Sequence, residues 1–162
     1  MIQSSLFKKP PKYILDTCSF SELKYRYCED VFQSVWVKIF EKIEEGLIIS
    51  CEEVYEELLT QDDEFISKLS EHKDLFVKLD SNVEKEVTQI LSEHPKILDI
   101  KKKKSGADPF LIATAKAYTC TVVTEERYSN SPNIEKIPDV CSAYQIKCIT
   151  FLDMLRELEI KV

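Results

Sequence analysis

The sequence predicts an α/β protein whose mainly parallel sheet is covered by helices on both faces. Short apolar segments, such as residues 13–15 and 120–123, have the length and composition of buried strands. Between them lie longer segments in which apolar residues recur every three or four positions, as in amphipathic helices. Strands that alternate with helices form βα units, and successive units build a parallel sheet between two helical layers.

Length and composition predict one globular domain. The chain has 162 residues, of which 44% are hydrophobic and 31% are charged, and these values suit a single domain over residues 1–162. The chain contains two glycines, which argues against a glycine-rich phosphate loop. No apolar run reaches the ~20 residues of a membrane span, and the N-terminus has no apolar signal segment, so we expect no membrane association.

Charge and cysteine content indicate which class of protein this is and in which redox compartment it is found. The net charge of −7 excludes a broadly basic protein that coats nucleic acid, but it leaves room for a local basic groove. The six cysteines form no C-x-x-C pair, and several lie in apolar runs. We therefore expect free thiols and a reducing cytoplasm rather than a disulfide framework.

The N-terminal elements follow from apolar spacing. Residues 13–15 are expected to form a strand that runs into a polar loop at residues 16–19. The periodicity of residues 31–43 predicts a long helix, and Gly46 follows it where a left-handed C-cap is expected. Residues 47–50 have the composition of a second buried strand.

The next elements begin with a capping signal. Ser50 and Glu53 have the spacing of a capping box, so a helix is expected to start after Ser50. Further along, helical spacing returns over two segments, and a short apolar run between them suggests a strand. These segments are residues 62–72 and 82–93, with the candidate strand at 75–79.

A strong helix start lies in the C-terminal half. Asp108 followed by Pro109 predicts an N-cap and the first helical residue. The strand at 120–123 follows this helix, and a polar loop that contains Pro132 and Pro138 comes next. The chain is expected to end with a strand at 146–149 and a helix at 151–158.

Acidic residues occupy the positions where parallel strands end. Asp16 follows the first strand, and Glu125 and Glu126 follow the strand at 120–123. Asp108 opens the helix before that strand, and Glu57 lies on the helix after the strand at 47–50. Because the carboxyl ends of parallel strands share one edge of the sheet, we expect these carboxylates to converge. A Mg²⁺ or Mn²⁺ ion would relieve their repulsion and support phosphodiester hydrolysis without histidine or cysteine.

Each acid also has an ordinary structural interpretation. Asp16 could cap a turn, and Asp108 could act only as a helix N-cap. Glu57 lies on a glutamate-rich helix where a solvated side chain is common, and the same applies to Glu126 after its strand. The functional interpretation therefore depends on the joint placement of the four residues.

Four short motifs in this order resemble the PIN-domain (PilT N-terminus) nucleases, including VapC-type toxins. The matching segments are YILDTCSF (13–20), ISCEEVYEEL (49–58), ADPFLIATA (107–115) and VVTEER (122–127), and KIPDVCSAYQIKCITFLDML (136–155) fits the C-terminal end of an uncharacterised prokaryotic PIN-like subgroup. The resemblance covers about residues 12–158. It implies a three-layer α/β/α sandwich with a five-stranded, mainly parallel sheet and a Mg²⁺ or Mn²⁺ site.

The resemblance also implies which acids form that site. The strand-end aspartate corresponds to Asp16, the glutamate before leucine in the second motif to Glu57, and the aspartate of the third motif to Asp108. The fourth position, commonly aspartate, is Glu126 in this chain. Glu53 lies four residues before Glu57 on the same helical face, so it remains the alternative second acid.

Polar and basic residues near the four acids are candidate substrate contacts. Hydroxyl groups beside the acids could orient carboxylates or bind phosphate, although turn capping explains them equally well; they are Thr17, Ser19 and Thr124. Lys103 and Lys104, in the lysine run 101–104, could guide an RNA backbone, although such a run is commonly only solvated. Arg127 beside Glu126 is a second basic candidate.

The sequence therefore predicts a cytoplasmic Mg²⁺- or Mn²⁺-dependent endoribonuclease. The resemblance implies the toxin of a toxin–antitoxin pair, with RNA as substrate, a cognate antitoxin protein as partner and a homodimer as a possible assembly. Two alternatives stay open: a non-catalytic partner-binding module on the same scaffold, and a DNA nuclease or phosphatase that uses the same acidic site. The number of metal ions and the RNA that is cleaved are also left open.

Overall fold

The computed structural model describes residues 9–61, 63–72, 74–98 and 106–162. The strands are β1 (Tyr13–Leu15), β2 (Ile48–Cys51), β3 (Phe76–Val77), β4 (Thr121–Val123) and β5 (Cys148–Ile149). The helices are α1 (Thr17–Tyr25), α2 (Gln33–Glu44), α3 (Glu52–Leu58), α4 (Asp63–Ser70), α5 (Ser81–Glu93), the short 3₁₀ helix η1 (Pro95–Ile97), α6 (Asp108–Tyr118), α7 (Ile137–Ala143) and α8 (Phe151–Glu157).

The five strands form one parallel sheet in the order β3-β2-β1-β4-β5. This confirms the α/β fold class and the five-stranded parallel sheet. In the register between the two central strands, Leu15 at the end of β1 lies opposite Val123 at the end of β4. The residues that follow, Asp16 and Thr124, are therefore brought to the same edge of the sheet.

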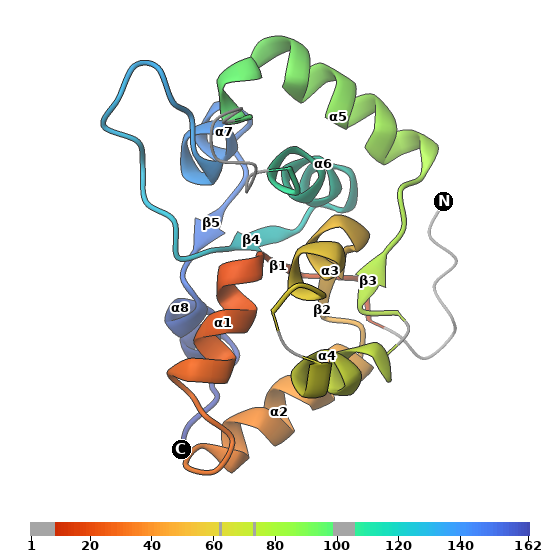
Figure 1. The fold of residues 1–162 in the computed structure, drawn as a ribbon, viewed down its shortest axis with the longest axis vertical. Helices are drawn as coiled ribbons and strands as arrows, with labels where there is room; N and C mark the ends of the chain where they lie inside the picture. The colour runs from red at the N-terminus through yellow and green to blue at the C-terminus, as the bar shows by residue number, and fades with distance from the viewer. Residues whose placement is uncertain (1–8, 62, 73, 99–105) are drawn as a thin grey trace.

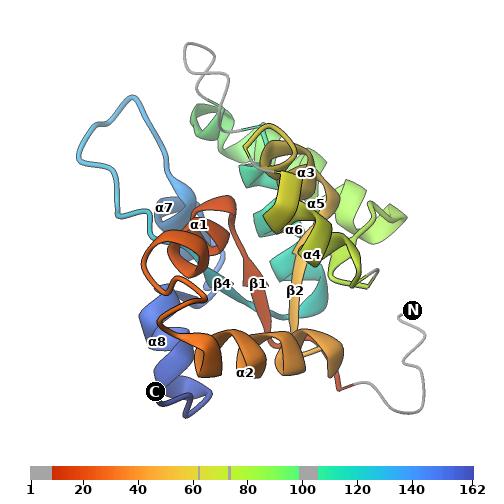
Figure 2. The same ribbon diagram turned by 60° about the horizontal axis from the view of Figure 1, so that its bottom comes forward.

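Helices cover both faces of the sheet. In Figure 1, α5, α6 and α7 lie above the strands, while α1, α2 and α8 lie below them. Figure 2 shows β1 and β2 side by side, running toward α1 and α3 at their carboxyl ends. The arrangement is consistent with a three-layer sandwich. None of the helices in the described ranges is long and apolar enough to cross a bilayer.

Helix α6 brings the third acidic motif against the sheet. It packs on β1, β2 and β4 on one face, and α5 packs on its outer side. Small residues allow close packing around this helix, because Ala113 and Ala115 are fully buried. The helix is therefore fixed along the sheet, and its first residue, Asp108, is fixed at the carboxyl edge.

The loop predicted after β1 is instead a helix. Asp16 is the N-cap of α1, and its Oδ1 accepts a hydrogen bond of 2.7 Å from the backbone N–H of Thr17. The helix was not predicted because one of its buried residues is polar: Ser19 is fully buried beside Phe20 and Leu23. Its buried face therefore does not look apolar in the sequence.

The capping box predicted at Ser50 is also wrong. Ser50 belongs to β2, and its hydroxyl donates a hydrogen bond of 2.6 Å to the backbone carbonyl of Leu15 in β1. Helix α3 starts one residue later, after Cys51, which makes no side-chain capping bond. The buried hydroxyl thus pairs with the neighbouring strand, which satisfies a polar group that could not reach water.

Two other expectations on local structure are confirmed and one is wrong. Gly46 follows α2 with a φ of 81°, the left-handed conformation expected of a C-cap glycine. All six cysteines are free thiols. Pro138, expected in a loop, is instead in the first turn of α7, where its missing N–H removes no helical hydrogen bond.

Candidate functional site

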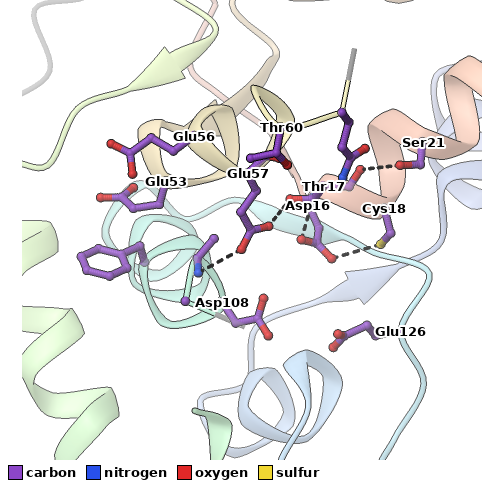
Figure 3. Close-up of a pocket in the computed structure, with 14 residues that line it drawn as sticks. Asp16, Thr17, Cys18, Ser21, Glu53, Glu56, Glu57, Thr60, Asp108 and Glu126 are labelled. Atoms are coloured by element: carbon purple, nitrogen blue, oxygen red, sulfur yellow. Dashed lines mark hydrogen bonds between the residues drawn. The ribbon is translucent and has the colours of Figure 1, made fainter. Parts of the chain in front are cut away.

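The four predicted acids line one open cavity of about 880 Å³ at the carboxyl edge of the sheet. They come from four separate parts of the chain: Asp16 between β1 and α1, Glu57 on α3, Asp108 at the start of α6, and Glu126 in the segment after β4. Figure 3 shows these four side chains around the same opening. The sheet topology thus brings together carboxylates that lie up to 110 positions apart in the sequence.

Asp16 is the most firmly held of the four. Its Oδ2 accepts hydrogen bonds from the Cys18 thiol at 3.0 Å and from the Thr124 hydroxyl at 2.9 Å, in addition to the Oδ1 bond from the Thr17 N–H. Burial raises the pKa of Asp16 to about 6, and the Glu126 charge adds to this effect, whereas the three hydrogen bonds oppose it. The carboxylate is therefore oriented before any ligand arrives.

Asp108 does not serve as the N-cap that its sequence suggested. The N-cap of α6 is Ala107, and Asp108 is the first helical residue, with 7% of its surface exposed. No described residue donates a hydrogen bond to its carboxylate. Burial, followed by the charges of Asp16, Glu126 and Glu57, raises the pKa of Asp108 to about 9. The ordinary capping interpretation of Asp108 therefore does not apply.

Glu57 is the glutamate of α3 that joins the group. Its Oε2 accepts a hydrogen bond of 2.6 Å from the Thr17 hydroxyl, and its Oε1 accepts one of 3.4 Å from the Ala107 N–H. Glu53 and Glu56 also line the cavity, but in Figure 3 their carboxylates point away from Asp16. Between the two candidates for the second acid, the geometry thus favours Glu57 over Glu53.

Glu126 is held by the start of α7. Its Oε2 accepts a hydrogen bond of 3.1 Å from the Ile137 N–H, and its own N–H donates one of 3.1 Å to the Thr124 hydroxyl. Glu125, its neighbour, instead accepts a hydrogen bond of 2.8 Å from the N–H of Phe151 at the start of α8. Of the two adjacent glutamates, one faces the cavity and the other ties α8 to the sheet edge.

Only some of the predicted substrate contacts lie beside the four acids. Thr17 and Thr124 bond directly to the acids, as described above. Ser19 does not line the cavity: it is fully buried and donates a hydrogen bond of 2.7 Å to the Val123 carbonyl. Arg127 lines a neighbouring cavity. Lys103 and Lys104 lie outside the described residues.

Cys18 is a site residue that sequence reasoning missed. Besides donating to Asp16, its sulfur accepts a hydrogen bond of 3.1 Å from the Glu125 N–H and contacts the Thr124 hydroxyl at 3.3 Å. Burial and the Asp16 charge raise the pKa of the Cys18 thiol, so it stays a protonated donor. The available signal was position: a residue two places after a helix N-cap lies within reach of the capping side chain.

The donor atoms around the cavity are carboxylate oxygens, which hard divalent cations prefer. Free oxygens are found on Asp108 and at Oε1 of Glu126, for which the described residues supply no hydrogen bond. In the side-chain positions of the structure, the described ranges contain no group of three or more His, Cys, Asp or Glu arranged to hold a metal ion. The cavity thus contains the ligand types for a cation, with free carboxylate oxygens on Asp108 and on Glu126.

Comparison with known proteins gives a family assignment and a structural likeness. No curated protein matches the chain. Among solved structures, the crystal structure of PAE2754 from Pyrobaculum aerophilum is similar, with 12% sequence identity and a TM-score of 0.48 over 96% of this chain and 94% of that one. Residues 13–162, which include all four acids, match the family described as a domain of unknown function, DUF4411. The chain therefore belongs to the DUF4411 family.

Proposed function

We propose that this protein is a Mg²⁺- or Mn²⁺-dependent endoribonuclease that hydrolyses RNA phosphodiester bonds, as PIN-domain nucleases do. Asp16, Glu57, Asp108 and Glu126 are its proposed metal ligands and catalytic residues. The observation that carries this proposal is geometric: four carboxylates from separate parts of the chain line one open cavity. The buried carboxylate of Asp108 is among them, and no described residue donates a hydrogen bond to it. A fold that crowds four acids in an open cavity is costly unless something positive binds between them.

The chemistry of the residues fits a divalent cation. All four candidate ligands offer carboxylate oxygens, and they come from the end of β1, from helices α3 and α6, and from the segment after β4. Binding requires side-chain rotation, because no three of the described acids are arranged around a common point. Both oxygens of Asp108 are free for such a rotation, whereas Glu126 has one free oxygen because the Ile137 N–H donates to the other. Asp16 and Glu57 are already oriented by hydrogen bonds.

The residues of the chain have distinct tasks in the proposed reaction. A bound Mg²⁺ or Mn²⁺ would supply Lewis-acid activation of the phosphate and of water. Cys18 and Thr124 fix the direction of the Asp16 carboxylate, and Thr17 fixes that of Glu57. Asp108 holds a proton at neutral pH and must release it to act as a ligand. The open cavity leaves room for an RNA strand to approach this group.

The decisive experiment is the Asp16→Asn substitution in a cleavage assay with labelled single-stranded RNA and Mn²⁺. Asparagine caps helices as well as aspartate does, so α1 should remain folded. We expect the variant to lose cleavage and to keep the melting temperature of the metal-free protein within about 3 °C. The control is Glu56→Gln, which lines the same cavity but points away from Asp16 and should stay active. An active Asp16→Asn protein would exclude this mechanism.

The biological part of the proposal follows from the resemblance to VapC-type toxins. We extend the proposal to a cytoplasmic toxin that a cognate antitoxin protein inhibits, with a homodimer as its candidate assembly. Expression of the wild type should arrest growth, and expression of Asp16→Asn should not. Co-expression of the protein encoded by the adjacent reading frame should relieve the arrest.

The same assays test the alternatives. Faster cleavage of single-stranded DNA than of RNA would change the substrate to DNA. A wild-type protein whose melting temperature does not respond to Mn²⁺ would support a non-catalytic module, because a ligand that binds the native state stabilises it by mass action.

A further inference from the structure

A second cavity, of about 460 Å³, adjoins the acidic one. Glu126 lines both cavities, so the second begins where the candidate site ends. It lies beyond β4 and β5, and its walls include Arg127, Tyr128 and Thr150. Pro138 and Ile149 add apolar surface to the same cavity. A volume of this size, with an apolar surface and a few polar groups, suits a small organic group such as a nucleobase.

Arg127 places a guanidinium group in this cavity, whose lining also contains the acids Glu126 and Asp153. Its side chain is exposed, and within the described ranges it forms no ion pair, in a chain whose net charge is −7. Asp153, which lines the same cavity, does not neutralise it, because that carboxylate pairs with Arg156 at 3.0 Å. A free guanidinium beside an acidic site fits a phosphate group, which it can bind through two parallel hydrogen bonds.

Tyr128 adds an aromatic surface. The residue is 62% exposed, and its ring contacts no other aromatic ring or cation in the part of the chain that the structure describes. Burial in the core therefore does not explain this side chain, as it explains Trp36 and Phe65, whose rings pack against each other at 5.7 Å. Exposed aromatic rings beside a basic group are the common platform on which single-stranded nucleic acids stack their bases.

We propose that this second cavity is a binding subsite for the nucleotide next to the scissile phosphate, with Tyr128 stacking on its base and Arg127 binding its phosphate. The inference rests on the proposed function, since it assumes that the scissile phosphate lies at the acidic group. It also specifies the substrate: only an unpaired nucleotide can turn its base onto a ring, because the bases of a duplex are stacked on one another. The substrate is therefore a single strand, or a loop of a folded RNA.

The test measures binding separately from cleavage. The probe is a fluorescently labelled ten-nucleotide single-stranded RNA, titrated with the full chain that carries Asp16→Asn to block hydrolysis. In that background, Tyr128→Ala and Arg127→Gln should each weaken binding by about tenfold, as loss of one stacking or phosphate contact does. Tyr128→Phe keeps the ring and should bind as tightly as the parent. The matched control is Tyr25→Ala, because Tyr25 is 66% exposed but lines neither cavity.

The outcomes separate this inference from the proposed function. Equal binding by Tyr128→Ala and Tyr25→Ala would overturn the subsite, while Mn²⁺-dependent cleavage by the wild type would leave the nuclease in place. Binding that depends on Tyr128, in a wild type that cleaves nothing, would keep the subsite and overturn the nuclease. A duplex of the same sequence that competes as well as the single strand would also overturn the subsite. If single-stranded DNA competes as well as single-stranded RNA, the subsite is supported and accepts either nucleic acid.

Discussion

At Asp108 the fold places a carboxyl group where its charge is disfavoured. The pKa of this group is about 9 in the folded protein, against an ordinary value of 3.8 for an aspartate. Between these two values the folded chain retains a proton that the unfolded chain has lost. The free energy of unfolding therefore falls as pH rises from about 4 to about 9, as far as this residue is concerned.

Asp108→Asn should remove this penalty. In EDTA at pH 8, the variant is expected to be more stable than the wild type by about 1–3 kcal/mol, and its advantage should shrink as the pH is lowered toward 4. Urea unfolding at several pH values measures the difference. Asp153→Asn is the control, because Asp153 is only partly buried and its pKa is lowered by Thr150 and Arg156; it should not stabilise the protein. A less stable Asp108→Asn protein would contradict the inference that burial and the neighbouring acids make the Asp108 charge destabilising.

A second prediction concerns the hydrogen bond that the Cys18 thiol donates to Asp16. Cys18→Ala removes a hydrogen-bond donor from Asp16 Oδ2, whereas Cys18→Ser keeps one. We expect Mn²⁺ to bind the alanine variant about tenfold more weakly, as is usual when a group that orients a metal ligand is lost, and to bind the serine variant nearly as well as the wild type. Thermal melting across a Mn²⁺ titration gives both affinities. Wild-type affinity in the alanine variant would show that Cys18 does not position Asp16.

The sequence predicts the acids better than it predicts their supports. Asp16 and Glu126 stand directly after apolar strands, and Asp108 starts a clear helix, so their positions along the chain indicate a shared edge. Two donors, Thr17 and Thr124, stand beside the acids and were named as candidates, and both do bond to acids of the group. The third donor, Cys18, was not named, because it looks like an ordinary small residue. Ser19, named as a candidate contact, turns inward to the Val123 carbonyl instead. The direction of a short side chain depends on contacts that only the folded chain supplies.

At the scale of helices, α6 ends on a strained residue. Thr119, the C-cap, has φ 57° and ψ 49°, which is a left-handed conformation that a β-branched side chain disfavours. Thr119→Gly should raise the free energy of unfolding by about 0.5–1 kcal/mol. Ala117→Gly, two residues earlier in the same helix, should lower it by about the same amount. Chemical denaturation of the two variants tests the contrast, and a destabilised Thr119→Gly protein would contradict it.

Most helices were predicted from apolar spacing or capping signals, but α1 and α7 were not. Helices α2 and α5 present regular apolar stripes, and both were expected close to where they lie. Helix α1 was missed because its buried face includes Ser19, and α7 was missed because Pro138, in its first turn, is also typical of a loop. Short helices depend on tertiary packing more than on their own periodicity.

For the whole molecule, cation binding should be coupled to proton release. At pH 7.5 the Asp108 carboxyl is mostly protonated, and it must ionise to serve as a metal ligand. Addition of Mn²⁺ in weakly buffered solution should therefore release about one proton per protein, which a pH indicator dye can measure. Asp108→Asn should release none. Binding of Mn²⁺ by the wild type without proton release would exclude Asp108 as a ligand.

The strand order was the part of the fold that local sequence patterns could not supply. Alternating strands and helices predicted a parallel sheet, but many orders satisfy that pattern. The observed order places β1 at the centre, between β2 and β4, so that Asp16 lies between the segments that carry Glu57 and Glu126. The order arises from how the helical faces pack over the whole sheet, and this packing depends on contacts between segments that are far apart in the sequence.

The hydrogen bond between Glu126 Oε2 and the Ile137 N–H closes a loop around the segment from 127 to 136. Because this bond anchors the fourth acid at the base of the loop, the length of the tip does not set the position of the carboxylate. Asn133 and Ile134 lie within this segment and are exposed, and the entropic penalty of lengthening a loop grows slowly with its length. An epitope tag spliced between these two residues should therefore be tolerated, which offers a way to label the protein without disturbing its acidic centre.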